Sequence, residues 1–163
     1  MKLRNELYIA LLTAISLVLF LVEGLIPLPF IAPGAKLGLA NIVTVFVLYT
    51  LGVRACLSIL LLRTLLASFF GGGPTIFLYS CAGGFLSIAA MSTLKRTTRF
   101  SMLGVSAAGG FFHHLGQLIM AAFATDTLAI FRYLPILGPC GLITGLIIGY
   151  LAAKCQRPNL LLE

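Results

Sequence analysis

The sequence has few charged residues and no tryptophan. Only 9% of its 163 residues are charged and 60% are hydrophobic, and the mean hydropathy is +1.11. A water-soluble domain of this length needs a more polar surface, so the composition excludes that class and indicates an integral membrane protein. The apolar runs are longer than the core of a signal peptide and continue toward the C-terminus, so we expect no cleaved targeting segment.

Acidic residues are scarcer than basic ones, at 4 against 11. The acids are scattered, and none lies within four residues of another: Glu6, Glu23, Asp126 and Glu163. No carboxylate pair is therefore available to hold magnesium against a diphosphate, and we expect no enzyme activity from this chain alone. The glycine run at 71–74 lacks the Lys-Ser/Thr that follows in a phosphate-binding loop, so a nucleotide site must belong to another chain.

The sequence contains no pattern typical of a metal site or of a nucleic-acid-binding surface. The cysteines have no CxxC spacing, which disfavours a disulfide or metal role: Cys56, Cys81, Cys140 and Cys155. We expect neither a metal ion nor another cofactor. The net charge of +7 would suit nucleic acid, but the basic residues form no single stripe. Membrane topology explains them better.

Glycine, proline and charged residues divide the apolar sequence into six segments of roughly bilayer-crossing length. The predicted spans are 7–28, 37–51, 53–70, 75–94, 100–124 and 128–153. The runs are continuously apolar rather than alternating, which disfavours a β-barrel. We therefore predict one all-α transmembrane domain over residues 1–163, with six helices.

Basic residues are distributed unevenly between the two ends of these spans. With the N-terminus in the cytoplasm, eight basic residues fall inside, whereas only Lys36 and Arg132 fall near the outer face. This asymmetry predicts that both termini are cytoplasmic. In the last span, Gly141, Gly145 and Gly149 repeat every four residues, which predicts close helix packing.

Strongly polar side chains are rare within the predicted spans. Each costs at least about 2.5 kcal/mol in hydrocarbon and therefore needs a partner, a wet cavity or a function. They are Glu23, Lys36, Asn41, Arg63, His113, His114 and Gln117. The helical rise puts most of them in the outer half of the membrane, so we expect them to share one external cavity. The alternatives are interhelical hydrogen bonding and, for Arg63, a side chain that snorkels to the inner surface.

The adjacent histidines have different expected orientations. His114 and Gln117 are three residues apart and share a helix face, whereas His113 and Gln117 share a neighbouring one. One histidine is expected to point into the bundle, with His114 favoured.

Four segments carry a resemblance to a known family. They are "GAKLGLANIVTVFVLYTLG" (34–52), the arginine of "LLRTLLAS" (Arg63), "HHLGQL" (113–118) and "GLITGLIIG" (141–149). Together they resemble the small bacterial membrane family catalogued both as Gx transporters and as heptaprenyl diphosphate synthase component I. That family is similar in its six-helix plan to the substrate-binding S-components of energy-coupling factor (ECF) transporters, which import micronutrients.

The resemblance implies a bacterial cell-membrane protein with a pocket in its outer half. The loop at 26–36 would close that pocket, and Ala10 and Ala14 would dock the first helix on a coupling subunit that works with two ATPases. Gly34 and Gly38 would let the chain turn into the second span, Lys36 would place a cation at the mouth, and Asn41 would donate or accept a hydrogen bond lower down.

The charges near this pocket favour a small anionic or polar-aromatic ligand. Lys36, Arg63 and Arg132 outnumber the nearby acids. Four aromatic residues are candidates either for ring contacts with the ligand or for a membrane-interface belt: Tyr79, Phe111, Phe112 and Tyr133. The absence of tryptophan leaves no large stacking platform.

Three functions remain open at this point. The leading hypothesis is a substrate-capture subunit of an ECF-type importer for a micronutrient or cofactor precursor. The alternative is a non-catalytic membrane partner in polyprenyl diphosphate or quinone synthesis. The third is a purely structural assembly module, for which substitutions of Lys36, Asn41 and His114 would change stability but not transport.

Overall fold

The structure is a computed structural model that describes residues 2–25, 38–97 and 99–156. These ranges contain helices and no strand. The elements are α1 (Lys2–Leu25), α2 (Ala40–Thr50), α3 (Val53–Ala67), the π-helical turn η1 (Ser68–Gly72), α4 (Gly73–Arg96), α5 (Met102–Thr125), the 3-10 helix η2 (Leu128–Tyr133) and α6 (Leu134–Gln156). Each α-helix overlaps one predicted segment, so the all-α prediction is confirmed.

Local sequence explains where several helices begin and end. Gly52 and Gly73 adopt φ of 86° and 62°, a left-handed backbone region that glycine enters without a steric cost, and they separate α2 from α3 and η1 from α4. The hydroxyl of Ser101 accepts the Gly104 N–H at 3.3 Å and caps the start of α5. Asp126, at φ 50°, ends that helix.

Four helical stretches are long and apolar enough to cross a membrane: Leu3–Leu25, Val53–Phe70, Gly73–Arg96 and Leu128–Gln156. The remaining two depart from the simple six-span prediction. α2 has 11 residues and rises only about 16 Å, roughly half of a bilayer's hydrocarbon core. α5 has 24 residues but carries His113, His114 and Gln117. Length and composition therefore give four membrane-span candidates among the six described α-helices, which is consistent with a multi-pass membrane protein.

The outer face of α1 supports the same conclusion. Leu7, Leu11 and Val18 are between 56% and 63% exposed, and they belong to a long apolar surface along this helix. A soluble monomer rarely leaves a contiguous apolar surface of this kind in water. The exposed face of α1 therefore suits lipid or a partner helix.

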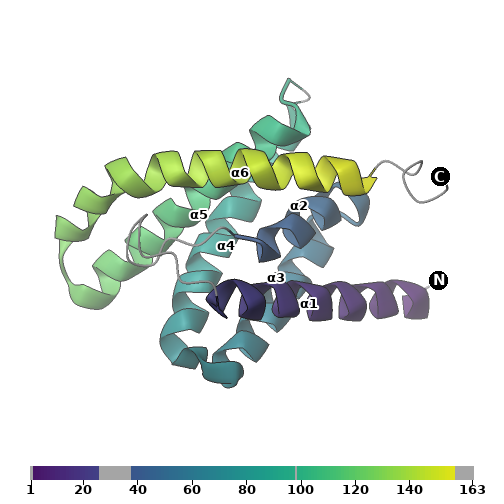
Figure 1. Cartoon of the computed structure of the whole chain (residues 1–163), viewed down its shortest axis with the longest axis horizontal. Helices are drawn as coiled ribbons and strands as arrows, with labels where there is room; N and C mark the ends of the chain where they lie inside the picture. Colours follow the sequence, from purple (N-terminus) through teal and green to yellow (C-terminus); the bar gives the residue numbers. More distant parts are fainter. Residues whose placement is uncertain (1, 26–37, 98, 157–163) are drawn as a thin grey trace.

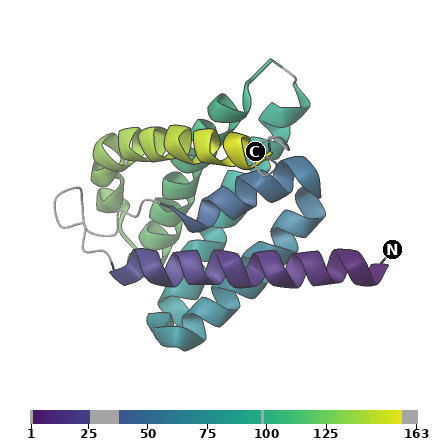
Figure 2. The same ribbon diagram turned by 45° about the vertical axis from the view of Figure 1, so that its right-hand side comes forward.

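Two of the six helices occupy central positions in the bundle. α2 lies between α1 and α6 in both views, and α5 packs against α4 on one side and α6 on the other (Figures 1 and 2). The N-terminal end of α1 and the C-terminal end of α6 lie at the same end of the molecule (Figure 1). This arrangement encloses a space between the end of α1, the start of α2 and the middle of α5.

Glycines allow α5 and α6 to approach closely, as the four-residue repeat predicts. A Cβ added to Gly141 would lie 2.6 Å from the Gly110 carbonyl oxygen, and one on Gly145 would lie 2.5 Å from the Ser106 carbonyl oxygen. Neither distance is sterically possible, so only glycine permits this packing. The predicted function of the repeat in helix packing is confirmed.

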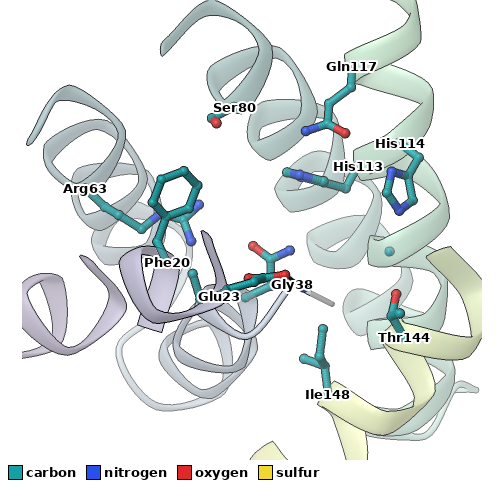
Figure 3. A pocket seen from close by; sticks show the side chains of 13 residues that line it. Phe20, Glu23, Gly38, Arg63, Ser80, His113, His114, Gln117, Thr144 and Ile148 are labelled. Atoms are coloured by element: carbon teal, nitrogen blue, oxygen red, sulfur yellow. Dashed lines mark hydrogen bonds between the residues drawn. The ribbon is translucent and has the colours of Figure 1, made fainter. Parts of the chain in front are cut away.

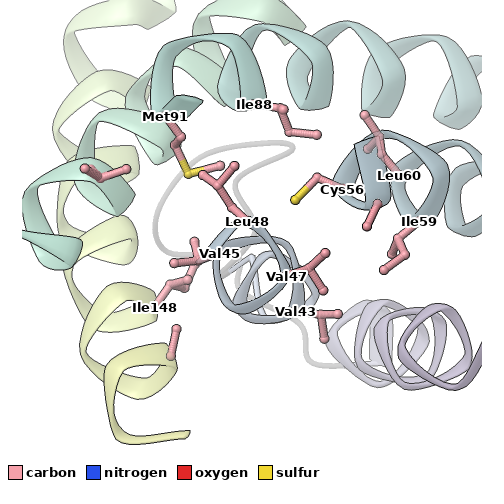
Figure 4. Close-up of a cluster of buried hydrophobic side chains, with 13 residues drawn as sticks. Val43, Val45, Val47, Leu48, Cys56, Ile59, Leu60, Ile88, Met91 and Ile148 are labelled. Atoms are coloured by element: carbon pink, nitrogen blue, oxygen red, sulfur yellow. The ribbon is translucent and has the colours of Figure 1, made fainter. Parts of the chain in front are cut away.

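The hydrophobic core surrounds α2. Val47 is fully buried, and Val45 and Leu48 are each 1% exposed. They contact apolar side chains of α3, α4 and α6, including Ile59, Ile88 and Ile148 (Figure 4): the core cluster comprises Val43, Val45, Val47, Leu48, Ala55, Cys56, Ile59, Leu60, Ile88, Met91, Val105, Ile148 and Ala152. A helix that is apolar on all sides belongs in such an interior position, which explains why α2 can be short.

Candidate functional site

A small polar chamber is lined by residues of all six α-helices and by Gly38, just before α2. Its volume is about 50 Å³, which is room for only a few water molecules. We call it the polar chamber; its lining residues are Phe20, Glu23, Gly38, Ala40, Asn41, Arg63, Ser80, Gly110, His113, His114, Gln117, Thr144 and Ile148 (Figure 3). Side chains that are far apart in the sequence thus converge on one interior point.

Glu23 links the end of α1 to the start of α2 in one wall of this chamber. It is 4% exposed, and its two carboxylate oxygens accept the backbone N–H groups of Gly38 and Leu39, the latter at 3.0 Å. Gly38 itself adopts φ 76°, a conformation that turns the chain into α2. The predicted turn at Gly38 is confirmed, and the Glu23 contacts hold that turn against the end of α1.

Arg63 is a buried cation that lines the chamber from α3, on the same side as Phe20 and Glu23 (Figure 3). Its side chain is 3% exposed, so it does not snorkel to a surface. Nη1 donates to the hydroxyl of Ser16 at 3.4 Å, and that hydroxyl donates to the Ala40 carbonyl oxygen at 3.2 Å. Nε has no hydrogen-bond partner among the described residues. The guanidinium of this lining residue therefore retains an unused donor.

The two histidines are positioned by a close approach of α4 to α5. A Cβ on Gly83 would lie 2.7 Å from the His113 carbonyl oxygen, and one on Gly116 would lie 2.6 Å from the Ala82 carbonyl oxygen. This packing brings Ser80 of α4 to the same chamber as His113, His114 and Gln117. His114 is 6% exposed, and its Nδ1 has no hydrogen-bond partner among the described residues. Both histidines thus line the chamber, whereas the sequence predicted only one.

A larger and mostly apolar chamber adjoins the polar one. Its volume is about 410 Å³, within the range of sites that hold small organic ligands. We call it the apolar chamber; it is lined by Ile76, Tyr79, Ser80, His114, Gln117, Leu118, Ala121, Ile130, Tyr133 and Leu137. Ser80, His114 and Gln117 line both chambers. These three side chains form the boundary between a polar space and an apolar one.

Most of the residues singled out by sequence come together. Six of the ten candidate binding residues line the polar chamber: Glu23, Asn41, Arg63, His113, His114 and Gln117. Tyr79 and Tyr133 line the apolar chamber. Arg132 is exposed and lines neither chamber. Phe111 and Phe112 are half-buried and also line neither chamber. Lys36 and the expected closing loop at 26–36 lie outside the described residues.

Sequence reasoning missed several residues of the site. Ser80 and Thr144 line the polar chamber from α4 and α6, and Ser16 holds Arg63. A small hydroxyl within an apolar span is a weak signal, because such side chains also bond to their own helix. Thr144, for example, donates to the Gly141 carbonyl oxygen at 3.3 Å. Whether a serine or threonine faces the chamber depends on how its helix is rotated about its axis, and the sequence does not give that rotation.

Two further expectations concern metals and partners. The described residues contain no group of three or more His, Cys, Asp or Glu side chains placed to hold a metal ion. Ala10 and Ala14 are exposed on α1, so this small-residue face is not covered by another helix of the same chain. Such a face lets a partner helix approach the backbone closely.

Comparison with known proteins agrees with the sequence resemblance. Residues 12–155 match the model of the family described as heptaprenyl diphosphate synthase component I. The chain matches no curated protein and no solved structure. The matched range covers most of the 163 residues and includes all the lining residues of both chambers. This chain belongs to the heptaprenyl diphosphate synthase component I family.

Proposed function

We propose that this chain is a non-catalytic membrane subunit that associates with a prenyl diphosphate synthase and binds a small molecule in its interior. The family match carries the first half of this proposal, because its description names a component of such a synthase. The match favours this function over micronutrient import, which the sequence alone placed first. We place the protein in the bacterial cell membrane, with both termini in the cytoplasm and the chambers in the outer half.

The distribution of acids supports a non-catalytic role. Within the described residues, Glu6 is exposed on the first turns of α1, Glu23 is buried near its other end, and Asp126 is exposed after α5. None of them is paired with a second carboxylate to bind magnesium and a diphosphate. Chain elongation would then take place on a soluble partner, and this subunit would anchor the partner or hold a ligand for it.

Co-purification tests the association. The tagged full chain, extracted in mild detergent, should retain a soluble prenyl diphosphate synthase from its own cells. Membranes that lack this chain should show lower chain-elongation activity, and re-expression should restore it. A synthase that does not co-purify, together with unchanged elongation after deletion, would contradict the proposal.

Substrate capture for an ECF-type importer is the second candidate function. Two observations favour it: the polar residues enclose a chamber, and Ala10 and Ala14 are exposed on α1. The partners would be one coupling subunit and two ATPases, and the ligand a micronutrient or cofactor precursor. Ala10→Leu and Ala14→Leu should then abolish association with a coupling subunit, whereas Ala124→Leu, at another exposed alanine, should not. Unchanged association in all three variants would exclude this function.

A further inference from the structure

We infer that the polar and apolar chambers together bind one amphiphilic ligand, with a compact anionic head near Arg63 and an apolar body beside Tyr79 and Tyr133. This inference rests on the ligand-binding role proposed above and specifies the class of ligand. Its basis is that two chambers of opposite character adjoin each other. Ser80, His114 and Gln117 belong to both linings.

Volume excludes a vitamin-sized ligand that occupies the polar chamber alone. About 50 Å³ holds a small head group but no vitamin-sized molecule. The adjoining 410 Å³ provides the missing space, and its lining is dominated by isoleucine, leucine, alanine and tyrosine side chains. A fully polar ligand would leave polar groups unpaired there, whereas an apolar chain or ring would gain roughly 0.8 kcal/mol for each buried CH₂ group.

The charges of Arg63 and Glu23 balance in this lining, so it is the unpaired donor of Arg63 that favours an anionic head group. Arg63 is the one cationic side chain among the described residues that line the polar chamber. Its Nε is without a partner although the side chain is 3% exposed. Glu23, the one carboxylate of that lining, already uses both oxygens to accept the Gly38 and Leu39 N–H groups. An anionic head would satisfy Arg63 without displacing these contacts.

The three side chains shared by the two chambers can bond to a ligand that extends from one chamber into the other. His114 is 6% exposed, and its Nδ1 has no hydrogen-bond partner among the described residues. Ser80 and Gln117 add a hydroxyl and an amide at the same boundary. These groups can bond to the polar atoms that link the head to the body. Together with Arg63, they orient the ligand so that its apolar end lies in the larger chamber.

A set of three probes tests this arrangement on the full chain in nanodiscs of uncharged lipid. The probes are geranyl monophosphate (head and body), inorganic phosphate (head alone) and geraniol (body alone), with binding measured by equilibrium dialysis. Geranyl monophosphate should bind at least about tenfold more tightly than either fragment. Equal binding of the whole molecule and one fragment, or no binding of any probe, would overturn the inference.

Variants assign the two parts of the ligand to the two chambers. Arg63→Gln should weaken geranyl monophosphate binding by about tenfold or more, because a charge-assisted hydrogen bond is lost, and should leave geraniol binding unchanged. Ala121→Phe fills the apolar chamber and should weaken both. Ala124→Phe, an exposed position on the same helix that lines neither chamber, is the matched control.

The outcomes separate this inference from the function on which it rests. If Arg63→Gln fails to fold, the probe set and the Ala121→Phe variant still decide the result. Binding of geranyl monophosphate that is unaffected by Ala121→Phe would overturn the two-chamber arrangement even if the synthase still co-purifies. Conversely, tight and variant-sensitive binding in a chain that retains no synthase would support the ligand class and contradict the proposed association.

Discussion

Glu23 and Gly38 are 15 residues apart in the sequence and are joined by a hydrogen bond from the Gly38 N–H to the Glu23 carboxylate. The second oxygen of that carboxylate accepts the Leu39 N–H at 3.0 Å. A single buried acid thereby fixes the end of α1 against the turn that begins α2. The same contact forms part of the polar chamber wall, so the packing of α1 against α2 and the shape of the chamber both depend on it.

Glu23→Gln should lower the free energy of unfolding by about 1–3 kcal/mol, because a buried charge-assisted pair of bonds is disturbed. The glutamine amide would direct its NH₂ group at one of the two backbone N–H donors. Thermal unfolding in detergent measures the change, and Glu6→Gln, at an exposed position of α1, is the control. A similar loss in both variants would show that the Glu23 contacts contribute nothing specific.

Gly145→Ala should separate α5 from α6. Its Cβ would lie 2.5 Å from the Ser106 carbonyl oxygen, which belongs to backbone and cannot move aside cheaply. We expect a loss of about 1–3 kcal/mol in unfolding free energy. Gly104→Ala on α5 is the control, since its Cβ would meet its nearest neighbour at 3.7 Å. Equal stability of the two variants would contradict the close packing.

Lys95→Gln should loosen the end of α2. The Lys95 ammonium donates to the Leu48 carbonyl oxygen at 2.7 Å and lies 4.6 Å from the centre of the Tyr49 ring. Loss of both contacts should cost about 1–2 kcal/mol. Hydrogen exchange of the α2 amides measures the local effect. Arg96→Gln, at the exposed neighbouring position, should leave that exchange unchanged, and faster exchange in both variants would argue against a specific contact.

Single cysteines at the two ends of α5 test whether this polar helix crosses the membrane. Cys140 and Cys155 are replaced by serine, whereas the buried Cys56 and Cys81 remain. In intact cells, an impermeant thiol reagent should label Asp126→Cys, and it should label Ser101→Cys only after the membrane is opened. Labelling of both from outside would show that α5 does not cross, and the reverse pattern would invert the proposed orientation.

The helices were largely predictable because glycine, proline and charge mark their ends. Gly52 and Gly73 separate neighbouring helices with left-handed backbone conformations that favour glycine. The burial of α2 among the other helices was less predictable. Its sequence is as apolar as a lipid-facing span, but its neighbours α1, α3 and α6 cover it, and a helix covered by protein need not be long enough to cross the bilayer.

The candidate site was predictable in its charged and imidazole groups, since these are rare in apolar helices. The choice between a buried and a snorkelling Arg63 was not, because it depends on Ser16 of another helix. Ser80 and Thr144 were missed for a related reason: small hydroxyls are common in such helices, and only helix rotation directs them into the chamber. The division into a polar and an apolar chamber follows from packing among α4, α5 and α6.

The central claim is that scattered polar residues form one interior site that binds a small molecule. Mass spectrometry of ligands retained by gently purified protein tests it most directly. The account predicts that wild-type protein and the exposed-site variant Arg54→Gln carry the same small anionic molecule, and that correctly folded Arg63→Gln has lost it. Wild-type protein without any bound molecule, or equal retention by all three proteins, would contradict the account.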